Sequence, residues 1–477
     1  MNGHFSRNVA WITGSSLVEN LTGIFVFVLV ARIIGAEAFG IVMMAFAFVF
    51  IGEVLVRDTV TEAIIARDTI EDGRLEGTFA VLMMLSLGIV ALLILFSPAI
   101  AALYGQPEVA SLLVVASPSI LFLGAGGVSS AILRRNLDFR TVAIRDALAV
   151  VAGGAVCIAM AVGGFGAWSL IAQRLVQLSV SAVISVVAAG WLPKRFPTRA
   201  DLLLVRGLGP NTIILRISSL VIAQTPTIAL GLTAGPVAVG LYSFAFRLVE
   251  LLTTFVSFPL KGVAQSSFAE LRRHTGDTAR FLLDVSQIAA LIAFTAFAGL
   301  AVVAIPGVLL SVGPDWDGAG KILPWLCLMG AVNALVAIHE AYLLAYGKIS
   351  RFLIAAGIEV AVGIVLVGLA APFGLLAVSV AATVRAVVAF PIRSNVALAT
   401  EAIGWKRYLA KLVAPLLISV GMALVVLVWQ RLIGVTMGVT FLFLSSILVG
   451  GLTFFALMPV AMPGSITKAL RMIRREA

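Results

Sequence analysis

The sequence is short of charged residues. Only 12% of its 477 residues are Asp, Glu, Lys or Arg, whereas a soluble domain carries about 25%. Hydrophobic residues make up 61% of the chain, and the mean hydropathy is +1.12. So little polar surface cannot cover a core of this size in water. The composition therefore excludes a soluble enzyme, a nucleic-acid-binding domain and a disordered scaffold, and nucleic acid is not expected as a partner.

Cysteine and clusters of reactive side chains are equally scarce. The two cysteines, Cys157 and Cys327, lie far apart inside apolar runs, which excludes a disulfide framework and a metal-binding cysteine pair. The sequence shows no nucleophile–base set, no metal-ligand spacing and no phosphate-binding glycine loop. We therefore expect no catalytic residues, no metal and no cofactor, and we interpret both cysteines as small buried hydrophobic residues.

Long apolar runs dominate what is present. A helix needs about 20 mostly apolar residues to cross a membrane, and fourteen runs of about that length follow one another along the chain. They cover residues 9–31, 39–63, 78–103, 109–133, 142–163, 167–190, 208–231, 237–260, 282–309, 322–346, 351–371, 374–398, 409–430 and 434–459. The first run is too long for a cleaved signal peptide and leads directly into further spans. The sequence thus predicts an all-α integral membrane protein with about 14 transmembrane helices.

The basic residues predict how these helices are oriented. With the N-terminus in the cytoplasm, only Arg32, Lys321 and Arg431 of the 33 lysines and arginines fall in outer segments, and four arginines fall inside spans. All others, including Arg145 and Arg393, are assigned to inner segments. Because Lys and Arg concentrate on the cytoplasmic side, this bias predicts that both termini are cytoplasmic. The outer loops are short, the longest covering about residues 306–321, so no domain is expected outside the bilayer.

Two pairs of similar segments indicate an internal repeat. Residues 235–246 match residues 35–46 at five of twelve positions, and Phe373-Gly374 repeats Phe165-Gly166 at a similar offset. Both units begin on the same side of the membrane, which predicts parallel repeats about a pseudo-twofold axis, as in transporters whose halves rock around a central cavity. The predicted domains are an N-terminal six-helix bundle (1–190), a cytoplasmic linker (191–206), a C-terminal six-helix bundle (207–400), and two further helices with a basic cytoplasmic tail (401–477).

A family resemblance is spread over the chain. It is carried by the segments LVARIIGAEAFGIVMMAFAF (29–48), AILRRNLDFR (131–140), GGFGAWSLIAQRLVQ (163–177), GPVAVGLYSFAFRLVELL (235–252) and VGPDWDGAGKILPWL (312–326). Together they resemble the polysaccharide transporter family of the MOP superfamily, the Wzx-type flippases of lipid-linked oligosaccharides. The resemblance implies that an undecaprenyl-pyrophosphate-linked oligosaccharide is moved by alternating access across a bacterial inner membrane, for exopolysaccharide, capsule or O-antigen synthesis. It also implies contact with membrane lipids and with a polysaccharide polymerase or co-polymerase.

Charged side chains inside the apolar runs are the candidate functional residues. Ionisable groups at membrane depth are costly and usually face a cavity or an ionic partner. Arginine suits a lipid pyrophosphate because its planar guanidinium donates two hydrogen bonds and stays charged when desolvated. The candidate residues of a substrate cavity are Arg174, Arg216, Arg247 and Arg385. The alternative is internal pairing, since Arg247 and Glu250 lie three residues apart on one helix face.

Acidic residues in the spans have two interpretations. They could bind H⁺ or Na⁺ and couple transport to an ion gradient, or they could neutralise the arginines. The candidates are Glu19, Glu250 and Glu359. Glu53 and Glu340 lie closer to the predicted inner interface, where their side chains are expected to snorkel to water. His339 is interpreted as a hydrogen-bonded packing residue rather than as part of a proton relay.

Two other functions fit a bundle of many spans. A cation-coupled multidrug exporter of the same superfamily would need an acidic cavity, and the four arginines inside the spans argue against one. A membrane-embedded glycan-processing enzyme would need a catalytic constellation or a sizeable outer loop, and the sequence shows neither. The favoured interpretation is therefore a flippase without enzymatic activity.

Overall fold

The protein is helical over nearly all of the chain that the computed structural model describes. The described residues are 2–65, 72–198, 210–273, 277–434 and 437–461, and no strand occurs in these ranges. Helices suit hydrocarbon because each backbone N–H and C=O finds its partner within the same segment. The predicted all-α membrane fold is confirmed.

The chain forms two compact units that divide between Gly240 and Leu241. The helices of the first unit are α1 (Asn2–Ile65), α2 (Asp72–Tyr104), α3 (Glu108–Ala116), α4 (Ser119–Arg135), α5 (Phe139–Val162), α6 (Trp168–Ala189) and α8 (Pro210–Thr233). Within this unit α1 packs on α4, α5 and α8, and α6 packs on α4 and α5. Because α8 packs on α1, the unit continues past residue 190, where the predicted N-terminal bundle ends.

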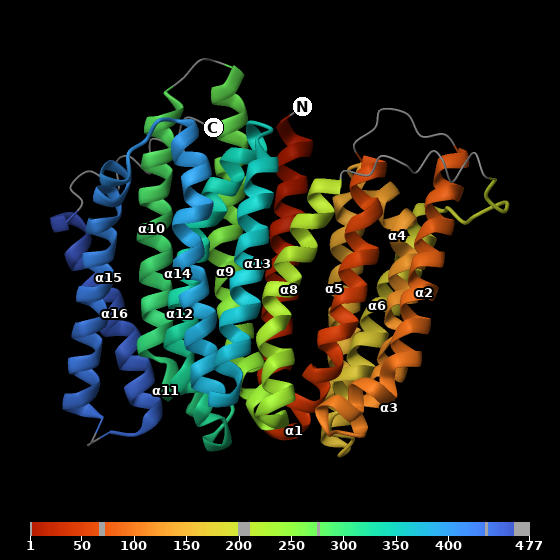
Figure 1. The fold of residues 1–477 in the computed structure, drawn as a ribbon, viewed down its shortest axis with the longest axis horizontal. Helices are drawn as coiled ribbons and strands as arrows, with labels where there is room; N and C mark the ends of the chain where they lie inside the picture. The colour runs from red at the N-terminus through yellow and green to blue at the C-terminus, as the bar shows by residue number, and fades with distance from the viewer. Residues whose placement is uncertain (1, 66–71, 199–209, 274–276, 435–436, 462–477) are drawn as a thin grey trace. The chain divides into compact units, whose positions relative to one another are not determined.

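The second unit is built around α10, α12 and α14. Its helices are α9 (Gly235–Arg273, which begins in the first unit), α10 (Thr278–Val302), α11 (Ala304–Ser311), α12 (Asp317–Ala345), α13 (Ile349–Ala370), α14 (Leu375–Thr400), α15 (Trp405–Ile433) and α16 (Val439–Ala461), with the 3₁₀ turns η1 (Pro314–Trp316) and η2 (Ala371–Phe373). Figure 1 shows α12 beside α10 and α14, which agrees with their packing. The last two helices extend this unit, because α15 packs on α10 through Ile418 and Leu291, and α16 packs on α15 and α11.

Twelve helices in the described ranges are long and apolar enough to cross a membrane. The difference from the predicted fourteen has two sources. The first two predicted spans are joined in α1 across a turn at Gly35, whose φ of 78° is not helical. The seventh predicted span corresponds to α8, which is not among the twelve and directly follows residues 199–209, outside the described ranges. Each of the fourteen predicted spans therefore has a helical counterpart.

Two of the predicted spans are interrupted. The fourth breaks between α3 and α4 at Ser117-Pro118, because proline has no N–H to continue the helical hydrogen bonds. The ninth ends with α10 at Val302, and α11 follows almost at once. The prediction of an outer loop over residues 306–321 is wrong, because α11, η1 and the start of α12 make most of this segment helical.

The repeated turns have matching backbone geometry. Gly35 and Gly235 open the two similar segments and have φ values of 78° and 81°. Gly166 and Gly374, in the second pair of similar turns, also have positive φ, at 51° and 85°. Glycine adopts this region without the steric penalty that a Cβ would bring. The same residue thus stands at each equivalent turn for the same conformational reason.

Gly40 and Gly240 lie where the two similar segments meet inside the first unit. A Cβ on Gly40 would lie 1.8 Å from the carbonyl oxygen of Pro236, and one on Gly240 would lie 2.1 Å from that of Ala36. Residues 36 and 236 are equivalent in the repeat, as are residues 40 and 240. The contact is therefore reciprocal, which is the pattern that a local two-fold axis produces.

Candidate functional site

Glu53 and Arg174 form a buried ion pair in the first unit. Glu53 lies on α1 and is only 3% exposed. From α6, Arg174 donates through Nε to Glu53 Oε1 at 2.9 Å, and its Nη2 contacts Oε2. Ser119, the first residue of α4, donates its hydroxyl to the same carboxylate at 3.4 Å. The prediction that Glu53 snorkels to the inner interface is wrong, because its carboxylate is enclosed and paired inside the bundle.

Arg174 keeps limited access to its surroundings. Its side chain is 20% exposed, and its guanidinium carbon lies 5.6 Å from the centre of the Phe50 ring, one turn before Glu53 on α1. A buried guanidinium has to be paired to offset its loss of hydration, and here it is paired with the Glu53 carboxylate and covered by the Phe50 ring. In this conformation Arg174 therefore joins α1 to α6 through its bonds with Glu53.

Two arginines converge on Glu359 in the second unit. Glu359 lies on α13 and is 3% exposed. Its Oε2 accepts a hydrogen bond from Arg393 Nη1 at 2.8 Å, and its Oε1 lies 3.7 Å from Arg385 Nε. Both arginines belong to α14, about two turns apart and so on one face. Arg393, which charge patterning assigns to an inner segment, lies within α14, is 15% exposed and pairs inside the helical bundle.

Arg385 is enclosed by the helices that surround it. Its side chain is 4% exposed, and its Nη2 lies 3.5 Å from the sulfur of Met329 on α12. A Cβ on Gly363 of α13 would lie 2.8 Å from Arg385 Cδ. The absence of a side chain at Gly363 therefore makes room for the arginine. In this conformation Arg385 contacts α12 and α13 rather than an open surface.

Arg247 and Glu250 form an exposed pair on α9. Arg247 Nη1 donates to Glu250 Oε2 at 2.6 Å, and the two side chains are 51% and 50% exposed. The pairing considered as an alternative for these residues is thus present, and it leaves half of each side chain accessible. Arg216 on α8 is exposed as well. Two of the four candidate arginines therefore lie at accessible surfaces, and the other two belong to buried clusters.

The remaining acidic and histidine candidates lie in different settings. Glu340 on α12 pairs with Lys261 of α9 at 2.9 Å and is 18% exposed. His339 is fully buried, with its ring 5.3 Å from that of Tyr408. Its buried packing matches the prediction, but neither ring nitrogen has a hydrogen-bond partner among the described residues. Glu19 lies on α1, and its side chain falls outside the described residues.

Arg145, which charge patterning assigns to an inner segment, is a buried charge in the structure. It lies on α5 and is only 4% exposed. Its Nη1 donates to Ser130 of α4 at 2.8 Å and to Ser185 of α6 at 3.1 Å, and its Nε donates to Asp146 at 2.9 Å. The sequence does carry a signal for this position, because Arg145 falls inside the apolar run 142–163. In this structure it joins three helices of the first unit.

No metal centre is evident in the described part of the chain. None of its groups of His, Cys, Asp and Glu has three members placed to hold an ion. The arrangement consists instead of arginine–carboxylate pairs, three of them with a buried or mostly buried arginine inside the helix packing and one at an accessible surface. An accessible guanidinium of this kind can also bind a phosphate, since arginine forms bidentate hydrogen bonds with both carboxylate and phosphate groups.

The sequence is similar to curated proteins of polysaccharide biosynthesis. It is 26% identical to the succinoglycan biosynthesis transport protein ExoT of Rhizobium meliloti, over 72% of this chain and 69% of that protein. It is 21% identical to the lipopolysaccharide biosynthesis protein WzxC of Escherichia coli, over 68% and 66%. It is 24% identical to the teichuronic acid biosynthesis protein TuaB of Bacillus subtilis, over 60% of each chain. The matched part thus spans about two thirds of these relatives.

The fold is similar to those of solved transporters. The lipid II flippase MurJ in an inward closed conformation gives a TM-score of 0.79 over 94% of this chain and 98% of that one, at 18% identity. An inward-facing multidrug resistance MATE family transporter of the MOP superfamily gives 0.65 over 80% and 94%, at 17% identity. At these identities the likeness establishes the fold and leaves the substrate open.

The family comparison covers the larger part of the chain. The family described as polysaccharide biosynthesis protein matches residues 29–321. This stretch includes both copies of the repeated hairpin and the residues Glu53, Arg174 and Arg247. Together with the twelve candidate membrane spans and the relatives above, this family match identifies a multi-pass membrane protein. The chain belongs to the polysaccharide biosynthesis protein family.

Proposed function

We propose that this protein flips undecaprenyl-pyrophosphate-linked oligosaccharides across the bacterial inner membrane by alternating access, for exopolysaccharide, capsule or O-antigen synthesis. The observation that carries the proposal is the exposed arginine Arg247. It lies about twelve residues into α9, or about 18 Å along the helix, and is 51% exposed. A charge facing hydrocarbon at that depth is too costly. Glu250 neutralises one edge of the guanidinium, and the exposed remainder can contact water or an anionic ligand.

The chemistry of a lipid pyrophosphate fits this surface. In the free protein Glu250 occupies one edge of the Arg247 guanidinium. A pyrophosphate offers more oxygens than a carboxylate and can take over this pairing, because arginine binds phosphate through two parallel hydrogen bonds. Arg216, also exposed, is the second arginine expected to contact the ligand. Arg174 and Arg385 would join only after a rearrangement that releases them from Glu53 and Glu359.

The relatives support a transporter rather than an enzyme. One is named as a transport protein for succinoglycan biosynthesis, and the fold is also that of a lipid II flippase. The proposal includes cytoplasmic N- and C-termini, a polysaccharide polymerase or co-polymerase as a partner, and coupling of the cycle to H⁺ or Na⁺. The coupling candidates remain Glu19, Glu250 and Glu359. Glu250 is the most accessible of those described, because Glu359 is already held by two arginines.

Reconstitution tests the proposal directly. Proteoliposomes containing the full chain receive a fluorescent lipid-linked oligosaccharide, and a membrane-impermeant reagent reports how much reaches the other leaflet. We expect flipping by the wild type and a rate at least about tenfold slower for Arg247→Ala, because one charge-assisted contact is lost. Lys321→Ala is the matched control, since Lys321 also forms an exposed pair, with Asp317. Absence of flipping by the wild type would overturn the function. Chemically altered glycan would indicate an enzyme, and drug efflux would indicate a multidrug exporter.

A further inference from the structure

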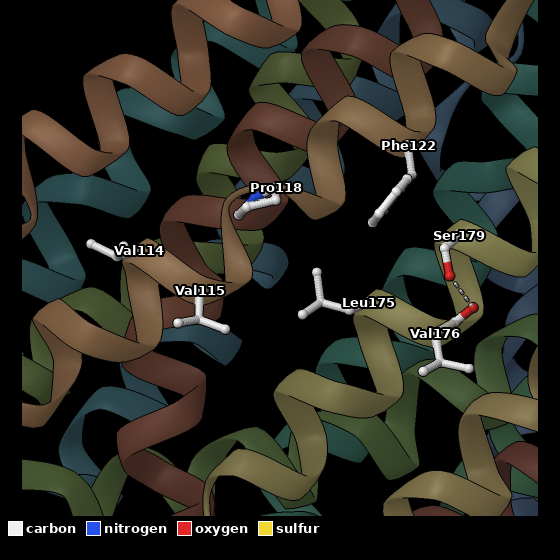
Figure 2. Close-up of a pocket in the computed structure, with 7 residues that line it drawn as sticks. All are labelled: Val114, Val115, Pro118, Phe122, Leu175, Val176 and Ser179. Carbon is white, nitrogen blue, oxygen red and sulfur yellow. Dashed lines mark hydrogen bonds between the residues drawn. The ribbon is translucent and has the colours of Figure 1, made fainter.

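Two surface features of the first unit differ in their chemistry. The residues that line the pocket between α3–α4 and α6 carry no charge, and its one hydroxyl, Ser179, donates to the Val176 carbonyl at 3.0 Å (Figure 2). Such a lining offers no charge and no spare donor that would select one ligand. The end of the unit at which α4 and α6 finish is different, because exposed basic and exposed apolar residues follow one another there along the chain.

The ends of α4 and α6 and the start of α5 meet at one end of the unit. Arg145, near the start of α5, donates to Ser130 near the end of α4 at 2.8 Å and to Ser185 near the end of α6 at 3.1 Å. Directly beyond α6, the Trp191 carbonyl accepts a hydrogen bond from Ser129 of α4 at 3.4 Å. The connection between α4 and α5 and the segment that follows α6 therefore lie at the same end.

The segment that follows α6 is held against α2. The backbone N–H of Lys194 donates to the carboxylate of Glu76, a residue near the start of α2 that is 4% exposed, at 2.9 Å. The Trp191 ring lies 5.9 Å from that of Phe79, also on α2. Although the chain is fixed at these two points, Phe196 is 95% exposed. Its side chain is thus presented outward by a segment that is itself anchored.

Leu137 presents a second apolar side chain outward, from the connection between α4 and α5. The Leu137 N–H donates to the Arg134 carbonyl and the Asp138 N–H to the Leu133 carbonyl, both at 3.1 Å. In this type of helix end glycine usually follows the last residue, and α6 does end at Gly190, with a φ of 60°. Leu137 has a φ of 56° and is 62% exposed. A leucine therefore bears the steric cost of a left-handed conformation while packing little against the unit.

The lengths of the helices place both segments at a membrane interface. The candidate spans α5 and α6 have 24 and 22 residues, which at 1.5 Å per residue is about 36 and 33 Å. Because the hydrocarbon core is about 30 Å thick, residues that adjoin the ends of these helices lie in the head-group region. Exposed leucine and phenylalanine side chains can reach the acyl boundary from there, and lysine and arginine can reach phosphates.

The charge exposed at this end is positive. The exposed basic residues of the two segments are Arg134, Arg140, Lys194 and Arg195. Two carboxylates at the same end are engaged with the backbone, since Glu76 binds the Lys194 N–H and Asp138 accepts from the Thr141 N–H at 3.2 Å, at the start of α5. A positive surface with apolar side chains at the interface is complementary to anionic phospholipids, which attract each nearby lysine or arginine.

We propose that this end of the first unit binds anionic phospholipid head groups, with Leu137, Leu192 and Phe196 inserted at the acyl boundary. Leu192 is 64% exposed and lies in the same segment as Phe196. A soluble anion, a nucleic acid or an acidic protein would engage the basic residues but leave these apolar side chains in water. Binding fixes the ends of α2, α4 and α6 at the membrane surface, and it does not require that the protein transports a glycan.

Lipid binding by the full-length protein in detergent tests the basic residues. Phosphatidylglycerol or phosphatidylcholine with the same acyl chains is added, and native mass spectrometry measures the bound lipid. We expect the wild type to prefer phosphatidylglycerol, and Arg134→Gln combined with Lys194→Gln to bind it at least about tenfold more weakly, because two attractions to the head groups are lost. Both residues are exposed, so the unfolding midpoint without added lipid should stay that of the wild type.

The matched control is Arg32→Gln combined with Lys321→Gln, which removes one exposed arginine and one exposed lysine outside the two segments. It should keep the wild-type affinity for phosphatidylglycerol. Equal binding of the two phospholipids by the wild type, or equal losses in the two double variants, would overturn the proposal. Stronger competition by a polyprenyl pyrophosphate than by phosphatidylglycerol would identify a site for the lipid pyrophosphate instead and would overturn it as well.

A spin label tests the apolar residues. Cys157 and Cys327 are buried, so Phe196→Cys provides an accessible thiol for a nitroxide. In vesicles that contain phosphatidylglycerol, the label should be accessible to oxygen and shielded from a water-soluble nickel complex. Phe455→Cys is the lipid-exposed reference, because Phe455 is 71% exposed within the candidate span α16. A label at residue 196 that the nickel complex reaches freely would show that this segment lies in water, contrary to the proposal.

Discussion

Each of the two compact units buries an ionic cluster, but the clusters differ in stoichiometry. In the first unit Glu53 meets one arginine, Arg174, across α1 and α6. In the second, Glu359 on α13 meets two, Arg385 and Arg393 of α14. A one-to-one pair satisfies itself, whereas two guanidinium groups that share one carboxylate depend on it jointly. The first cluster is thus a self-contained connection between helices, and the second is held together by a single residue.

Unlike the two ionic clusters, the backbone turns of the two similar segments have the same geometry. Gly35 and Gly235 occupy equivalent turns and share nearly the same φ. At the same offset Thr253 stands at the position equivalent to Glu53, and at the offset of the second pair of turns Gln177 stands where the second unit has Arg385. The comparison teaches that a duplicated helical frame does not imply a duplicated ionic core. The following predictions test that difference, from the largest expected effect to the smallest.

The largest loss of stability is expected for Glu359→Gln. Removal of this carboxylate leaves Arg385 and Arg393 together in a nearly dry site, which should cost about 3–5 kcal/mol. The thermal unfolding midpoint of the purified protein in detergent measures the effect, with Glu250→Gln on the exposed pair as the control. Equal shifts for the two variants would show that the Glu359 cluster is not desolvated as the structure describes.

A smaller loss is expected for Glu53→Gln in the first unit. Arg174 would lose its partner, but its partial exposure limits the cost to about 2–3 kcal/mol. Adding Arg174→Met should restore most of the midpoint, because both charges are then gone. The same rescue in the second unit, Glu359→Gln with Arg393→Met, should stay incomplete because Arg385 remains. Equal rescue in the two units would remove the distinction between the clusters.

The shared backbone is tested by Gly40→Ala and Gly240→Ala. In each variant the new Cβ meets a carbonyl oxygen at an impossible distance, so the helices must shift, at a cost of about 1–3 kcal/mol. Because the contact is reciprocal, the two losses should be similar. Gly88→Ala in α2 is the control, since no described atom lies within 4 Å of the position that its Cβ would take. A loss confined to one of the two glycines would contradict a local two-fold relation.

The smallest change in stability is expected for Arg247→Ala. The Arg247–Glu250 pair is half exposed, and such pairs contribute less than about 1 kcal/mol. The unfolding midpoint should therefore hardly move, while flipping in proteoliposomes should fall. A large shift of the midpoint would instead mean that Arg247 supports the fold rather than the ligand.

Much of the fold can be predicted because apolar length and glycine turns are local properties. The fourteen apolar runs and the two pairs of glycine turns all correspond to helices and turns in the structure. The break at Ser117-Pro118 is not predictable in this way, because a proline inside an apolar run does not reveal whether the helix continues through it. The segment 306–321 contains polar residues and is therefore predicted to be a loop, but it includes parts of two short helical elements.

The sites are harder to predict because depth along a helix does not say which neighbour a side chain meets. The distribution of Lys and Arg assigns Arg145 and Arg393 to inner segments, although both residues fall inside apolar runs. Glu53 is expected at an interface and is instead paired with a residue from α6. The pair of Arg247 and Glu250 is predictable as an alternative, because both residues lie on one helix and their spacing alone brings them together.

The sequence by itself determined that this chain crosses a membrane many times, that it contains a repeat, and that it carries arginines within the spans. These features depend on composition and on periodic spacing, which are properties of the chain alone. Only the tertiary structure decided which carboxylate meets which guanidinium in the two buried clusters, because those partners lie on different helices. It also decided which arginines remain accessible, since burial depends on how neighbouring helices pack and not on the position of a residue within its own span.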